Sequence, residues 1–114
     1  MSTPVPVLKA PAEWTSERAP AVDATARGLL GDTGSRLVVD LSQTTFLASI
    51  GITSLIRLGK RLADAGGGVA LAHPTSAVVK LFRTIGLTRV LPLFDTVDEA
   101  RAYLTSARFV PSRP

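Results

Sequence analysis

A serine at position 49 stands where a helix is predicted to begin, shortly after a strand that ends at Asp40. Residues 37–51 read Leu-Val-Val-Asp-Leu-Ser-Gln-Thr-Thr-Phe-Leu-Ala-Ser-Ile-Gly. The first N–H groups of a helix lack partners within the helix, and the helix dipole favours negative charge there. The Ser49 hydroxyl can cap the helix by accepting a hydrogen bond from one of these groups. It can equally carry a phosphate that the same groups stabilise, and the residues alone leave both interpretations open.

Two other residues at predicted strand ends could do chemistry. A strand-end aspartate such as Asp40 is the phosphorylation site of receiver domains, which also need paired acidic residues after the first strand and a lysine after a later one. Here these places read Ala-Pro-Ala-Glu at 10–13 and His-Pro at 73–74, so we exclude a receiver. His73 is the only histidine, and no nucleophile triad or metal-ligand spacing surrounds it, so we expect a turn residue.

The composition excludes several classes of protein. There is no cysteine, which removes thiol catalysis, disulfides and thiolate zinc sites. The three glycines at 66–68 follow a predicted helix, whereas a phosphate-binding glycine loop follows a strand. We find no paired carboxylates and no catalytic triad. The sequence therefore predicts no enzyme, no metal site and no cofactor.

The charge and the lengths of the apolar runs indicate which partners and which cellular compartment to expect. The net charge is +4, but the basic residues are scattered and aromatic residues are few, so direct nucleic-acid binding is weakly indicated. No apolar run approaches the roughly 20 residues of a membrane span, and the first residues lack the pattern of a signal peptide. We expect a cytoplasmic protein that does not insert into a membrane.

Apolar periodicity predicts alternating strands and helices. The predicted strands are 5–9, 36–41, 69–72 and 90–94, and the predicted helices are 17–30, 50–65 (with Ser49 as an alternative start), 76–85 and 97–106. This order is typical of an α/β fold with a mixed or parallel sheet of four or five strands and about four helices. We expect one domain over residues 5–106, with flexible ends at 1–4 and 107–114.

The predicted elements place a core and a functional edge. The expected core residues are Val38, Leu41, Leu55, Leu62, Val69, Leu71, Leu81 and Leu104. Ligands and partners meet such sheets at the carboxyl ends of the strands. We expect these ends to be formed by residues 10–16, 42–50, 73–76 and 95–96. Trp14 lies in the first of them and is either part of the core or an exposed anchor for a partner.

Several blocks of the sequence resemble the STAS domain family, the anti-sigma factor antagonists of bacteria. Residues 37–42 are similar to its central strand, and Phe-Leu-Ala-Ser-Ile-Gly-Ile at 46–52 is similar to its phosphorylation loop. Residues 58–67 resemble its next helix and turn. Residues 79–95, with Thr-Ile-Gly-Leu and Leu-Pro-Leu-Phe-Asp, resemble its third helix and last strand, and 96–104 its final helix. The resemblance covers about residues 5–106.

The resemblance implies a mechanism. Such antagonists bind an anti-sigma factor that is also a serine kinase with a GHKL-type ATP-binding domain, and phosphorylation of the loop serine breaks the complex. By alignment that serine is Ser49. The family usually has aspartate before this serine and a second serine after it, whereas this chain has Ala48 and Ile50. The loop therefore lacks a carboxylate and is more apolar than usual.

Two functions follow from the resemblance and remain open. The chain is either an antagonist switched by phosphorylation or an unphosphorylated STAS subunit that docks on the ATPase of a membrane lipid-transport complex. Many family members also have an additional strand before 5–9, so a bare sheet edge could pair with a second copy. The residues expected to contact the partner are Trp14, Asp40, Ser42, Thr45, Ala48, Ile50, Gly51, Thr53 and Arg57.

Overall fold

The computed structural model describes residues 5–31, 34–87 and 91–105. The four helices among them are α1 (Ala19–Leu30), α2 (Ser49–Asp64), α3 (Ser76–Ile85) and α4 (Val97–Thr105). The strands are β1 (Val7–Lys9), β2 (Glu13–Trp14), β3 (Arg36–Asp40), β4 (Phe46–Leu47), β5 (Gly68–Ala72) and β6 (Leu93–Phe94). The predicted flexible ends, 1–4 and 107–114, lie outside the described residues.

The main sheet has four parallel strands in the order β1-β3-β5-β6. Val38 of β3 is in register with Val7 of β1 and with Ala70 of β5. Helical crossovers between neighbouring parallel strands confirm the predicted α/β class. The sequence did not predict β2 and β4, which form a separate parallel pair. Each has two residues, too few for an apolar period to be recognised.

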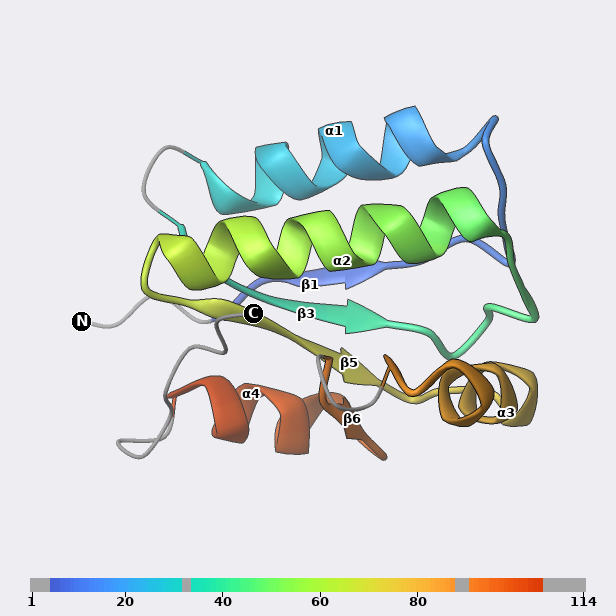
Figure 1. Cartoon of the computed structure of the whole chain (residues 1–114). Helices are drawn as coiled ribbons and strands as arrows, with labels where there is room; N and C mark the ends of the chain where they lie inside the picture. The colour runs from blue at the N-terminus through green and yellow to red at the C-terminus, as the bar shows by residue number, and fades with distance from the viewer. Residues whose placement is uncertain (1–4, 32–33, 88–90, 106–114) are drawn as a thin grey trace.

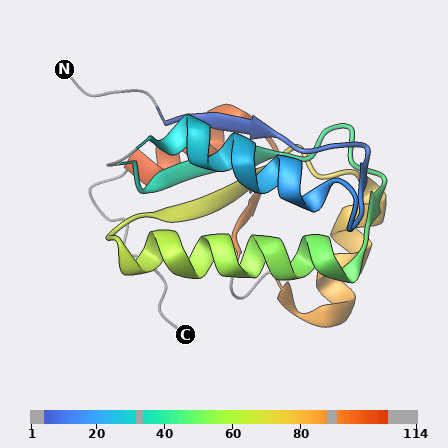
Figure 2. The same cartoon turned by 90° about the horizontal axis from the view of Figure 1, so that it is seen from above.

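Helices cover both faces of the main sheet (Figures 1 and 2). α1 and α2 pack on one face and α4 on the other, while α3 lies beyond the carboxyl ends of the strands. Side chains alternate between the faces of a strand. Leu37 and Val39 of β3 therefore enter the cluster beneath α1 and α2, whereas Val38 enters the cluster beneath α4.

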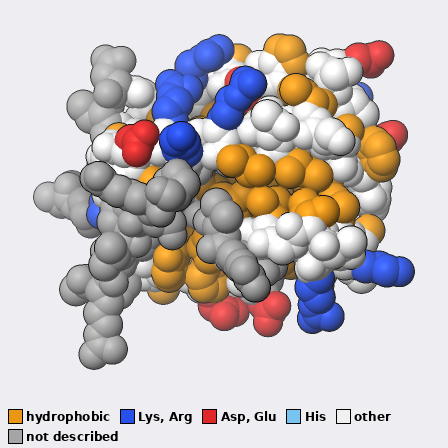
Figure 3. Space-filling model, viewed as in Figure 1, with side chains coloured by type: hydrophobic (Ala, Val, Ile, Leu, Met, Phe, Trp, Pro, Cys, Tyr) orange, Lys and Arg blue, Asp and Glu red, His pale blue; other side chains and the backbone are white. Residues whose placement is uncertain are grey.

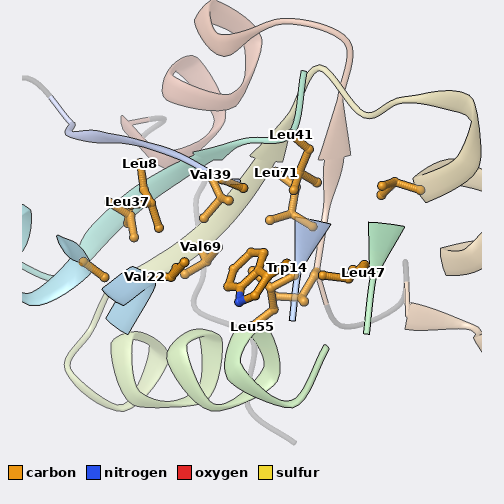
Figure 4. Packing of buried hydrophobic residues seen from close by; sticks show 14 of the residues in the cluster. Leu8, Trp14, Val22, Leu37, Val39, Leu41, Leu47, Leu55, Val69 and Leu71 are labelled. Carbon is orange, nitrogen blue, oxygen red and sulfur yellow. The ribbon is translucent and has the colours of Figure 1, made fainter. Parts of the chain in front are cut away.

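The two faces differ in side-chain size. Under α1 and α2 the core is built from leucines and valines around Trp14, as Figure 4 shows. Under α4, β5 presents Ala70 and Ala72, and α4 itself presents Ala100. These small side chains let α4 lie close to the sheet, and Leu104 and Val5 complete that layer.

The predicted core is confirmed with one correction. All of its members are buried except Leu81, which is half-buried and packs against the edge of the core from α3. The predicted end of α3 is also confirmed. Gly86 follows the helix with φ 71°, the left-handed conformation that glycine adopts without steric cost.

Candidate functional site

Three loops meet at the carboxyl edge of the sheet, as predicted, and hydrogen bonds hold them together. Gln43 Nε2 donates to the carbonyl oxygen of Ala10 at 2.8 Å, and Thr44 Oγ1 donates to that of Pro11 at 2.9 Å. Thr75 Oγ1 donates to the carbonyl oxygen of Thr44 at 2.6 Å. Thr44 is completely buried. The loop that leads to Ser49 is therefore fixed to both of its neighbours.

The β2–β4 pair anchors the end of this loop. The N–H groups of Thr45 and Phe46 both donate to the carbonyl oxygen of Ala12, at 2.9 and 3.2 Å. Two residues later, the Ala48 N–H donates to the carbonyl oxygen of Trp14 at 3.0 Å. The backbone on each side of β4 is thus held before α2 begins.

Trp14 and Gly51 form the support beneath the site. Trp14 is 1% exposed, and its indole lies beside Leu55 and Leu47 between the sheet and α2 (Figure 4). A Cβ on Gly51 would stand 2.7 Å from Leu47 Cδ1 and 2.9 Å from Trp14 Cγ, closer than real Cβ contacts. Glycine therefore lets the first turn of α2 rest on the indole ring.

This support corrects two predictions. Trp14 was expected to be either core or an exposed anchor, and its burial selects the core. Gly51 was expected to contact the partner, but it too is buried. Both residues can act on a partner only through the loop that they position.

The start of α2 differs from the interpretation of Ser49 as a cap by one position. The cap residue is Ala48, with φ −73° and ψ 165°, and its side chain makes no cap. Ser49 is instead the first helical residue, and its side chain is exposed. The interpretation of Ser49 as a structural cap is therefore wrong, because the extended conformation that a cap needs falls on Ala48.

This helix start is left open. Gly51 and Ile52 donate to the carbonyl oxygen of Ala48 at 2.9 and 3.2 Å. Within residues 5–31, 34–87 and 91–105, the N–H groups of Ser49 and Ile50 and the Ser49 hydroxyl have no hydrogen-bond partner. The first turn of α2 also carries no acidic residue. The site therefore presents a free hydroxyl beside free donors and the positive end of a dipole.

Exposed apolar residues lie close to Ser49 in the chain. Phe46 is 52% exposed and Ile50 38% exposed, on either side of Ser49 in the chain. Beside Phe46, a hollow of about 220 Å³ lies between β4 and α3, lined by Thr45, Phe46, Leu47, Ala77, Val78 and Leu81. Figure 3 shows hydrophobic side chains gathered in the middle of this face, over the amino-terminal half of α2.

The other predicted partner-binding residues divide into two groups. Ser42, Thr45, Thr53 and Arg57 are exposed, and Ala48 is half-buried. Asp40 is half-buried, and one of its carboxylate oxygens accepts a hydrogen bond from the Ser42 N–H at 2.9 Å. Asp40 therefore shapes the turn after β3.

The prediction from the sequence missed one apolar residue of this surface, Phe46. Phe46 was not among the predicted contact residues although it is the most exposed large hydrophobic residue described. Its outward direction follows from alternation in β4, in which Leu47 points inward. The signal in the sequence was the pair Phe46-Leu47, which only Ala48 separates from the expected loop serine.

Among the described residues, no three His, Cys, Asp or Glu side chains come together as metal ligands would. None of the described helices combines the length and the apolar character needed to cross a bilayer. His73 is exposed at the turn after β5, with φ 51°, as a turn residue would be.

Comparison with known families gives a match over most of the chain. The family model described as "Mlab, STAS domain" matches residues 2–93. Among curated proteins, no sequence matches this chain.

Solved structures share the fold at low sequence identity. A candidate anti-sigma factor antagonist from Thermotoga maritima superposes with a TM-score of 0.76 and 22% identity, covering 86% of each chain. An anti-sigma-factor antagonist (STAS) domain protein from Planctomyces limnophilus gives 0.72 and 22%, over 87% of this chain and 88% of that one. A sulfate transporter family protein from Wolinella succinogenes gives 0.75 and 14%, over 90% and 86%.

Proposed function

The chain belongs to the STAS domain family, and from this premise we propose that it is a cytoplasmic anti-sigma factor antagonist switched by phosphorylation of Ser49. Its partner in this proposal is an anti-sigma factor that is also a serine kinase of the GHKL type. The observation that carries the proposal is the open start of α2. An exposed hydroxyl without a partner stands there among exposed apolar side chains.

The helix start suits a phosphate. Phosphorylation adds about −1.5 to −2 charges and three acceptor oxygens. The free N–H groups at the start of α2 and the helix dipole stabilise this charge, so the fold survives modification.

The same charge opposes docking. A partner that covers Phe46 and Ile50 buries apolar surface and removes water from the residue between them. A phosphate on Ser49 would then have to lose its hydration against apolar groups, which is costly. The unmodified chain therefore binds the partner and the phosphorylated chain releases it.

The alternative function is an unphosphorylated STAS subunit docked on the ATPase of a membrane lipid-transport complex. The apolar loop favours it, because Ala48 and Ile50 make the surface suitable for permanent docking. Both functions use the same surface and differ in whether Ser49 is modified.

The deciding experiment is co-purification from lysate of the source organism, with mass spectrometry of bait and captured proteins. We expect wild type to capture a GHKL-type kinase, Ser49→Ala to retain it, and Ser49→Asp to lose it. Thr25→Asp is the matched control, since Thr25 is exposed on α1 and is not among the residues expected to contact the partner; it should bind the kinase as wild type does. Phosphate on another residue would refute the assignment of Ser49. Capture of transporter subunits without phosphoserine would select the alternative.

The contact surface has its own test. Ile50→Asp places a charge in the apolar patch, and Arg57→Glu reverses an exposed charge further along α2. We expect each variant to bind the kinase more weakly while circular dichroism and thermal unfolding stay close to wild type. If both bind as wild type does, the interface lies elsewhere.

The predicted homodimer would form through β1. This strand lies at the edge of the main sheet but has three residues and an exposed Lys9, features that limit edge pairing. Light scattering across a range of concentrations measures whether the dimer forms.

A further inference from the structure

A second surface lies between α1 and α2, towards their carboxyl ends. It is a groove of about 400 Å³, and its rim carries Arg27 from α1 and Arg57 and Arg61 from α2. Among the residues that line it, Asp23 supplies the only acidic side chain. Figure 3 shows Lys and Arg side chains gathered over α1 and α2, apart from the hydrophobic patch. The groove therefore combines concave shape with positive charge.

The floor of this groove is apolar. Ala26 and Leu62 are buried there, and Leu30 and Leu58 are half-buried. Leu30 and Leu58 pack against the core beneath and keep part of their surface facing the groove. A ligand that fits must present apolar groups to the floor and negative groups to the rim.

A purely structural role explains the arginines only in part. Arg27 and Arg61 lie in the last turns of their helices, where a positive charge stabilises the helix dipole. Arg57 lies in the middle of α2 and has no such role. In the part of the chain that the structure describes, none of the three guanidinium groups has an ion pair or hydrogen bond. Three neighbouring cations thus remain available to an anionic ligand.

We propose that this groove binds an amphipathic acidic helix of a partner protein. Carboxylates spaced along that helix would pair with the arginines on both sides, and its apolar side chains would cover the floor. A compact phosphate suits the place less well, because the carboxyl-terminal halves of two helices line it and their dipoles oppose concentrated negative charge. An acidic segment distributes its charge along the rim. The proposal does not depend on phosphorylation of Ser49.

The test uses the full chain and a fluorescein-labelled synthetic peptide with leucines at helical spacing and glutamates beside them. We expect saturable binding by fluorescence anisotropy, with ¹⁵N chemical-shift changes concentrated on α1 and α2. Replacing the glutamates of the peptide by glutamines, or making Arg27→Glu/Arg61→Glu, should weaken binding at least about tenfold. The matched control is Lys80→Glu/Arg83→Glu, which changes the net charge equally on exposed positions of α3. The control should bind within about twofold of wild type.

Three outcomes would overturn the proposal. The first is no saturable binding, and the second is equal weakening by the groove and control variants, which would indicate non-specific attraction. The third is a response of groove residues to inorganic phosphate but not to the peptide, which would indicate a small-anion site. Thermal unfolding of each variant verifies that it is folded. Ser49→Asp should leave peptide binding unchanged, which separates this test from that of the proposed function.

Discussion

The amino-terminal ends of α2 and α3 differ in whether a side chain caps their first N–H groups. Thr75 caps α3 by accepting a hydrogen bond from the Val78 N–H at 3.4 Å, while its hydroxyl donates to the loop before α2. α2 begins after Ala48 with no side-chain cap. The capped helix start serves the fold. The uncapped start exposes a serine and free donors, as expected if local stability is given up at the surface proposed to bind the partner.

α2 has no side-chain cap, so its stability should depend mainly on packing. Substitutions on the face of α2 that packs on the core should therefore lower the free energy of unfolding most. Leu55 is completely buried against the sheet. We expect Leu55→Ala to lower the free energy of unfolding by about 2–5 kcal/mol, measured by urea denaturation. The exposed neighbour Lys60→Ala should stay within about 0.5 kcal/mol of wild type. A loss below about 0.5 kcal/mol for Leu55→Ala would contradict the position of α2.

Removal of the cap of α3 should lower the free energy of unfolding by less than the substitution of Leu55 does. Thr75→Ala removes the cap and leaves the carbonyl oxygen of the buried Thr44 without this donor. We expect a loss of about 1–2 kcal/mol in the free energy of unfolding. Thr84→Ala, which removes an exposed hydroxyl in the same helix, is the control and should change stability by at most about 0.5 kcal/mol. Equal losses would mean that Thr75 does not cap α3.

A side-chain cap added at the start of α2 should raise the free energy of unfolding. Ala48→Asp supplies an acceptor for the free N–H groups, and we expect a gain of about 1 kcal/mol in urea denaturation. Ala48→Asn, which caps without charge, separates capping from the dipole effect. Unchanged or lower stability would show that the donors are already satisfied.

Long elements could be predicted from the sequence because their periods repeat. α3 was predicted with its observed bounds, and α2 within one residue at each end. The two-residue strands β2 and β4 were not predicted, because no period exists in them; β6 is as short but ends a longer predicted strand at 90–94. Their consequence was therefore missing too: the pairing of Trp14 with Leu47 that holds the loop.

The position of the candidate site in the fold could be predicted from the sequence, but its backbone conformation and packing contacts could not. The loop before α2 and its exposed residues followed from strand order and the position of Ser49. Which residue caps the helix depends on the backbone angles of Ala48, and the role of Gly51 depends on its distance to an indole ring far away in sequence. Both features depend on the tertiary structure, and the local sequence carries no signal of them.

The alanines beneath α4 have a consequence for synthesis. The chain leaves the ribosome from its amino end, so β1, β3 and β5 are available before α4, the last described helix. Until α4 arrives, the sheet face with Ala70 and Ala72 has no cover. Alanines expose less apolar area than the Val69 and Leu71 side chains that β5 directs to the opposite face. During synthesis, β5 therefore leaves its less apolar face uncovered the longest.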